Sequence, residues 1–151
     1  MQTTEPRWLS VDQQIHWRAF LDGVAQLNEH LDEALRPFGL DLGEYEILVR
    51  LSESPDRRLR MSELAAQARQ SRSRLTHTIN RMQAKALVCR VACASDGRGV
   101  MAVLTPSGFA LLEQAAPTHV QSVRQFLVDR IDPDDFAALG RAMRAVAQPL
   151  E

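Results

Sequence analysis

Apolar residues recur every three or four positions through the first quarter of the chain, a spacing that is typical of an amphipathic helix. Ser10, followed three residues later by Gln13, has the pattern of a capping box that begins such a helix. Pro37 and Gly39 end the pattern, so the sequence predicts one long helix within residues 9–38. Its apolar stripe consists of Phe20, Val24, Leu27, Leu31, Leu35 and Phe38.

Three shorter helices are predicted after this one. Residues 43–53 form the first of them, with apolar side chains on one face. We expect Ser62 to cap a second short helix, and Ser71 or Ser73 to cap a third that runs to about Ala86. Two helices joined by so short a turn are typical of a helix-turn-helix.

A β-hairpin is predicted directly after the helix-turn-helix. Residues 88–91 and 100–104 are rich in β-branched side chains, and they flank the polar, glycine-containing stretch 94–99. We expect one further short strand near residues 59–60. The hairpin then forms a wing beside the helices.

Two more helices complete the chain. Thr105 and Pro106 have the pattern of an N-cap followed by proline at the first helical position, and Pro117 should kink the long helix that they begin. Asp132 and Pro133 begin the last helix in the same way.

The predicted order of elements is α-α-α-α-β-β-α-α, so the fold class is mainly α with a small β-hairpin (α+β). With 45% hydrophobic and 25% charged residues, the 151-residue chain has the composition of an ordinary globular protein. We expect residues 1–151 to form a single protomer. A winged helix-turn-helix lobe of residues 43–104 lies in it between terminal helices at 9–38 and 105–150.

The sequence also bears on where the protein is located and on the chemistry of its two cysteines. No apolar run approaches the roughly 20 residues that cross a bilayer, and the N-terminus lacks the layout of a secretory signal, so we expect a cytoplasmic protein. Cys89 and Cys93 are four residues apart in the predicted strand, about 13 Å at the usual rise, which is too far for a disulfide. The two thiols are either small hydrophobes or sensors of oxidants.

The charges are distributed unevenly, although the net charge of the chain is only −1. Residues 57–100 hold ten basic and two acidic residues, a net charge of +8, and the rest of the chain carries −9. A basic block within an acidic chain indicates a local contact with a polyanion such as DNA.

The predicted helix of residues 72–86 has two opposite faces. At about 100° per residue, Leu75, Ile79, Met82 and Ala86 fall on the side that faces the core. The other side has no carboxylate, and its side chains suit base edges and phosphates: asparagine suits adenine, and arginine suits guanine or phosphate. The alternative is a solvated face that lacks acids by chance. The candidate DNA-binding residues of this helix are Arg72, Ser73, Arg74, Thr76, His77, Asn80 and Arg81.

The hairpin tip supplies further candidates. Gly97 and Gly99 allow a sharp turn, and Arg98 between them would reach the narrow minor groove, where the negative potential is strongest. Asp96 would repel phosphate, so we expect it to brace a neighbouring arginine. Gly97 and Arg98 therefore join the DNA-binding candidates.

Four segments together resemble the MarR family of bacterial transcription regulators. They are residues 71–81 (SRSRLTHTINR), 86–88 (ALV), 96–99 (DGRG) and 103–108 (VLTPSG). The one small departure is Ala86, because glycine is common there and caps the helix end more easily. The resemblance implies a sequence-specific, double-stranded DNA-binding repressor that binds a palindromic operator as a homodimer through its terminal helices.

The apolar stripes of the terminal helices agree with a dimer, but stripes of this kind also form ordinary cores. Regulators of this family commonly respond to small aromatic or phenolic acids held between the dimerisation helices and the DNA-binding lobe. His16, Trp17 and Tyr45 are the candidate ligand-binding residues for such an effector. The alternative for these three is aromatic packing at the subunit interface.

Other classes of function find little support in the sequence. The histidines and cysteines lack metal-ligand spacing, so we expect no metal and no cofactor. No phosphate loop or nucleophile elbow is present, so we expect no enzyme. The remaining alternative is a winged-helix adaptor that binds protein and has lost DNA binding.

Overall fold

The computed structural model describes residues 5–93 and 99–149, and its elements confirm the predicted α+β fold class. Its α-helices are α1 (Val11–Leu35), α2 (Leu42–Ser52), α3 (Met61–Gln67), α4 (Arg72–Ala84), α5 (Pro106–Phe126) and α6 (Pro133–Ala147). Its strands are β1 (Arg58–Arg60), β2 (Val88–Ala92) and β3 (Val100–Leu104), and short 3-10 turns lie at Arg36–Phe38, Pro55–Arg57 and Val128–Arg130.

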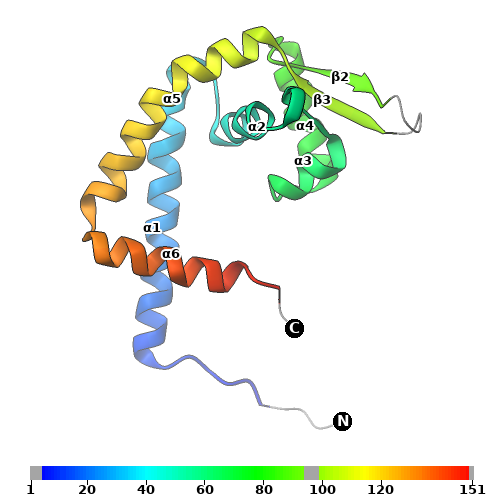
Figure 1. Ribbon diagram of the computed structural model, residues 1–151. Coiled ribbons are helices and arrows are strands. Elements are labelled where there is room, and N and C mark those ends of the chain that lie inside the picture. The colour runs from blue at the N-terminus through cyan, green and yellow to red at the C-terminus, as the bar shows by residue number, and fades with distance from the viewer. Residues whose placement is uncertain (1–4, 94–98, 150–151) are drawn as a thin grey trace.

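The three strands form an antiparallel sheet in the order β1-β3-β2. Leu59 of β1 pairs with Ala102, and Val88 of β2 pairs with Leu104, so β3 lies in the middle. The short strand expected near residues 59–60 is therefore confirmed. In Figure 1 the sheet lies with α2, α3 and α4 at one end of the molecule, while α1 and α5 extend away from this lobe in contact with each other.

The buried core lies almost entirely in the lobe. It joins apolar side chains from α2, α3, α4 and the sheet to the beginning of α5. Within α1, all of which the structure describes, Leu31 and Leu35 at the C-terminal end are buried. The earlier part of the predicted stripe is exposed, Phe20 at 38% and Val24 at 41%, and no residue of the fully described α6 is buried. The terminal helices thus leave apolar faces uncovered in the single chain.

Several predicted helix boundaries are confirmed by their caps. The side chains of Ser10, Ser71, Thr105 and Asp132 each accept a hydrogen bond from a backbone N–H in the first turn of the helix that follows. α5 continues through Pro117 and curves in Figure 1.

Two sequence predictions at helix ends are wrong. Ser62 is not an N-cap, because β1 passes directly into α3 and Arg60 occupies the cap position, where its side chain does not cap the helix. Ala86 does not face the core: α4 ends at Ala84, and Ala86 is exposed with a left-handed φ of 58°. This backbone reversal directs Leu87 and Val88 into the core, and it costs about 1 kcal/mol for a residue with a Cβ.

Gly108 marks the closest contact between α5 and the rest of the lobe. A Cβ at this position would overlap the carbonyl oxygen of Leu87 and lie 2.8 Å from Cδ1 of Leu104. Leu87 cannot retreat easily, because its carbonyl accepts a hydrogen bond from the backbone N–H of Thr105.

We therefore predict that Gly108→Ala lowers the free energy of unfolding by about 3 kcal/mol, since backbone must shift to make room. Ser107→Ala is the matched control, because Ser107 is exposed in the same helical turn and its loss should change stability by less than about 0.5 kcal/mol. Urea unfolding, monitored by circular dichroism, measures the free energy of unfolding of both variants. Equal stability of the two variants would contradict the prediction.

Candidate nucleic-acid interface

The helix α4 is anchored by one apolar side and exposes the opposite one. Leu75, Ile79 and Met82 are buried in the core, as the sequence predicted. Ser73 and His77 are exposed on the other side. Core packing therefore fixes which face of α4 is exposed, and no acidic residue occurs anywhere in the helix.

The N-terminal end of α4 concentrates donors and positive charge. Ser71 caps the helix by accepting from the N–H of Arg74 at 3.1 Å, and both Arg72 and Arg74 are exposed. The partial positive charge of a helix N-terminus adds to that of the two guanidinium groups. The hydroxyl of Thr76 donates instead to the carbonyl of Arg72 at 2.8 Å, so its hydrogen is already used within the helix.

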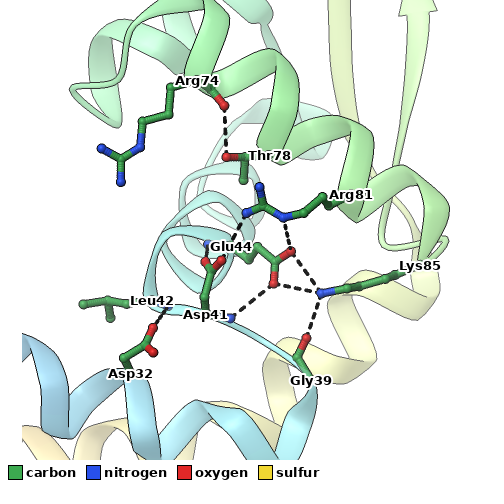
Figure 2. A network of polar contacts seen from close by, with 9 residues as sticks. All are labelled: Asp32, Gly39, Asp41, Leu42, Glu44, Arg74, Thr78, Arg81 and Lys85. Atoms are coloured by element: carbon green, nitrogen blue, oxygen red, sulfur yellow. Dashed lines mark hydrogen bonds and ion pairs between the residues drawn. The ribbon is translucent and has the colours of Figure 1, made fainter.

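One flank of α4 is held by a network of charges that connects it to the beginning of α2 (Figure 2). Glu44 is the centre of this network and is only 2% exposed. Lys85 donates to both of its carboxylate oxygens at 3.0 Å and to the carbonyl of Gly39 at 2.8 Å. Arg81 approaches Glu44 at 3.5 Å and donates to Asp41 at 3.1 Å. The end of α4 is thereby tied to α2.

Asp41 and Glu44 also cap α2 reciprocally. The N–H of Glu44 donates to Asp41 at 2.7 Å, and the N–H of Asp41 donates to Glu44 at 3.2 Å. The neighbouring N–H of Leu42 donates to Asp32 of α1 at 2.9 Å, as Figure 2 also shows. The same few carboxylates therefore start α2, join it to α1 and fix α4.

The opposite flank of α4 is held by Arg90 of β2. Its guanidinium donates to Asn80 Oδ1 at 2.7 Å and to Gln83 Oε1 at 3.0 Å, with a longer bond of 3.4 Å to the carbonyl of Thr76. Residues 76, 80 and 83 follow one another along one edge of the helix. Arg90 therefore connects the wing to α4 along about two turns of the helix.

The contacts on these two flanks separate residues that the sequence analysis had grouped together as DNA-binding candidates. Arg81 is turned toward Asp41 and Glu44, and Asn80 toward Arg90. The unbraced centre between them contains Ser73, His77 and Ala84, with Arg72 and Arg74 at its N-terminal end. Sequence reasoning missed Lys85, Glu44 and Arg90 as the residues that orient this surface.

A cleft of about 390 Å³ separates the N-terminal half of α4 from the wing. Arg60, Arg72 and Arg90 line it, and none of the described residues that line it is acidic. Gly99 lies directly before β3, at the end of the hairpin away from Val88 and Leu104, and so close to Arg60 that a Cβ would be 2.9 Å from its Nη1. The predicted wing-tip residues Gly97 and Arg98 lie outside the described residues.

The candidate effector residues are not brought together within one protomer. Tyr45 is buried in the core of the lobe, and its ring packs against His119 of α5 with centroids 4.3 Å apart. His16 and Trp17 are exposed on the N-terminal half of α1, and Trp17 stacks on Phe20 with centroids 6.0 Å apart. The helix rise places Trp17 about 27 Å along α1 from the end that meets α2.

Burial affects both members of the Tyr45–His119 pair. Desolvation raises the pKa of Tyr45 and lowers the pKa of His119, so both rings are neutral near pH 7. Nδ1 of His119 is buried and has no hydrogen-bond partner among the described residues.

Other kinds of site find no support in the part of the chain that is described. Residues 5–93 and 99–149 hold no group of three histidine, cysteine or acidic side chains that could bind a metal ion. None of the described helices is long and apolar enough to cross a membrane.

We predict that Glu44→Gln lowers the free energy of unfolding by about 1 to 3 kcal/mol, because it removes a buried acceptor of charge-assisted hydrogen bonds from two cations. Glu46→Gln is the matched control on the same helix. The Glu46 side chain is 42% exposed and pairs with Arg50 at 3.3 Å, so its replacement should cost well under about 1 kcal/mol. Thermal unfolding at low and high salt compares the two, and a larger loss for Glu46→Gln would refute the central role of Glu44.

Comparison with known proteins agrees with this geometry. A sequence model of the MarR family matches residues 38–99. Among solved structures, the chain is 45% identical to AbsC, a MarR family transcriptional regulator from Streptomyces coelicolor, with a TM-score of 0.90 over 94% of this chain and 96% of that one. It is 44% identical to Sco3205 from the same organism, solved in complex with DNA, with a TM-score of 0.93 over 97% of this chain and 94% of that one.

A curated relative is the HTH-type transcriptional repressor Rv2887 of Mycobacterium tuberculosis, which is 35% identical over 91 residues. The match spans 60% of this chain and 64% of the repressor, somewhat less than two thirds of its length. The likeness to the two Streptomyces regulators extends over nearly the whole chain, terminal helices included. The chain is therefore a member of the MarR family of transcriptional regulators.

Proposed function

We propose that this protein is a sequence-specific, double-stranded DNA-binding repressor that binds a palindromic operator as a homodimer. The observation that carries the proposal is the surface of α4, which is free of carboxylates and is braced on both flanks. A helix of this kind, placed in the major groove, offers its central side chains to base edges and its N-terminal arginines to phosphates. The similar regulator Sco3205 was solved in complex with DNA, which supports DNA binding by this chain. The similar curated repressors support repression over activation.

Arg72 and Arg74 are proposed to contact phosphates, and Ser73 and His77 to contact bases. Thr76 and Arg81 are proposed to act mainly within the protein, since both already have intramolecular partners. Gly97 and Arg98 remain proposed wing contacts in the minor groove. Arg60, Arg72 and Arg90 around the cleft would add to the positive potential beside the groove.

We predict that binding to random duplex DNA weakens about a thousandfold or more between 50 and 200 mM salt, as expected for six or more phosphate contacts. Arg74→Ala should weaken binding to all duplexes and reduce the slope against salt by about one. Arg36→Ala is the control, because this arginine is exposed in the 3-10 turn after α1 and pairs with neighbouring acids. An adaptor would show little affinity at either salt concentration, and that result would reject the proposed function.

The dimer is proposed from the apolar faces that the single chain leaves uncovered. Trp17, Phe20 and Val24 are exposed along α1, and Phe136 and Met143 along α6. In a dimer with twofold symmetry, α1 and α6 would be covered by the same helices of a second copy. The two α4 helices would then face the two half-sites of the operator.

We predict that the chain sediments as a dimer and that Val24→Asp shifts it to a monomer, because a carboxylate in an apolar interface remains unpaired. Val91→Asp is the matched control. Val91 is a valine of similar exposure, 47% against 41%, but it lies on β2 of the wing. Analytical ultracentrifugation of the parent and both variants measures their oligomeric state. A monomeric parent would exclude the dimer.

We also propose that a small aromatic or phenolic acid releases the protein from DNA. The rings of Tyr45 and His119 pack together at the junction of α2 and α5, and Nδ1 of His119 is buried without a hydrogen-bond partner among the described residues. His16 and Trp17 could join this surface only from a second protomer. Adding a panel of aromatic acids to the protein–DNA complex tests the release.

A further inference from the structure

The side chain of Asn80 is held in one orientation by Arg90. The Nη2 atom of Arg90 lies 2.7 Å from Asn80 Oδ1, the short distance of a charge-assisted hydrogen bond. The chemistry of the guanidinium decides which atom of the amide faces it. A guanidinium group only donates, so the atom that faces it must be the oxygen.

The amide nitrogen of Asn80 is therefore the group left for DNA. Asn80 is exposed, and no described residue accepts a hydrogen bond from its Nδ2. An asparagine that reads adenine must accept from N6 and donate to N7 at the same time. The oxygen keeps a second lone pair, but the guanidinium bound to it repels the amino group of adenine, so Asn80 meets DNA mainly as a donor.

N7 accepts a hydrogen bond on both purines, so a donor in the major groove distinguishes bases by their exocyclic groups. Guanine and thymine present the keto oxygens O6 and O4, whereas adenine and cytosine present amino groups there. The positive charge of Arg90 next to the amide acts in the same direction, because it attracts a keto oxygen and repels an amino group.

We propose that Asn80 reads a keto base, guanine or thymine, and that Arg90 is the positioning residue that sets this preference by engaging the amide oxygen. The inference rests on the proposed function, because it assigns a base preference within the α4 surface. It replaces the adenine contact that the residue type alone suggests.

The neighbouring contacts of Arg90 support a fixed orientation. The same guanidinium also bonds Gln83 at 3.0 Å, so its plane is held by a second side chain one turn further along α4. The two bonds come from different nitrogens, Nη1 and Nη2, which restricts rotation of the group. The Asn80 oxygen therefore has a partner whose position is itself constrained.

The test is selection of bound sequences from a random duplex pool with the full chain and four variants. Asn80→Ala should remove the preference at one position of each half-site, and in the parent that position should hold guanine or thymine with about fivefold preference over adenine. Arg90→Met frees the amide oxygen, so adenine should rise at the same position. Arg58→Met is the control, since it removes one exposed arginine from the same sheet and should leave the preference unchanged.

Asn80→Asp keeps a partner for Arg90 but removes the donor. It should lose the keto preference while its unfolding temperature stays near that of the parent, which separates base reading from folding. Adenine or cytosine at the Asn80 position in the parent would overturn the inference, and so would an Arg90→Met variant whose preference there is unaltered. A parent that enriches no sequence would instead reject the proposed function itself.

Discussion

The buried carboxylate of Glu44 is the interaction on which the geometry of the lobe depends. A carboxylate removed from water is tolerated only when its oxygens are satisfied, and here two cations and one backbone N–H satisfy them. Because these partners come from the end of α4 and the beginning of α2, satisfying the charge also fixes the angle between the two helices. The partner cations remain about half exposed, so the network lies at the edge of the lobe and not in its apolar centre.

The helix α4 is consequently held on three sides. Leu75, Ile79 and Met82 fix its depth by apolar packing, the Glu44 network fixes one flank, and Arg90 fixes the other. Both flanks use charge-assisted bonds, which depend strongly on direction. The helix can then meet DNA without a change in its position, and such preorganisation favours both affinity and discrimination.

Local signals in the sequence were sufficient for most of the elements. The caps at Ser10, Ser71 and Thr105, and the periodicity of α4, predicted the helices because each signal acts within one turn. Ser62 and Ala86 were misplaced because the direct passage from β1 to α3, and the early end of α4, are set by how the lobe packs. Likewise, the contacts of Arg81 and Lys85 join residues about 40 positions apart, and nothing near either residue indicates them. The Asp41–Glu44 capping box could have been recognised from its spacing, but its cationic partners could not.

The separation between the core and the terminal helices has a further consequence. The side chains that would touch bases are oriented by contacts inside the lobe, whereas α6 and most of α1 contribute nothing to its core. In a symmetric assembly, these outer helices alone would determine how far apart the two lobes stand. Mutations in them could therefore adapt a descendant to operators with a longer or shorter spacer and leave its base preferences as they were.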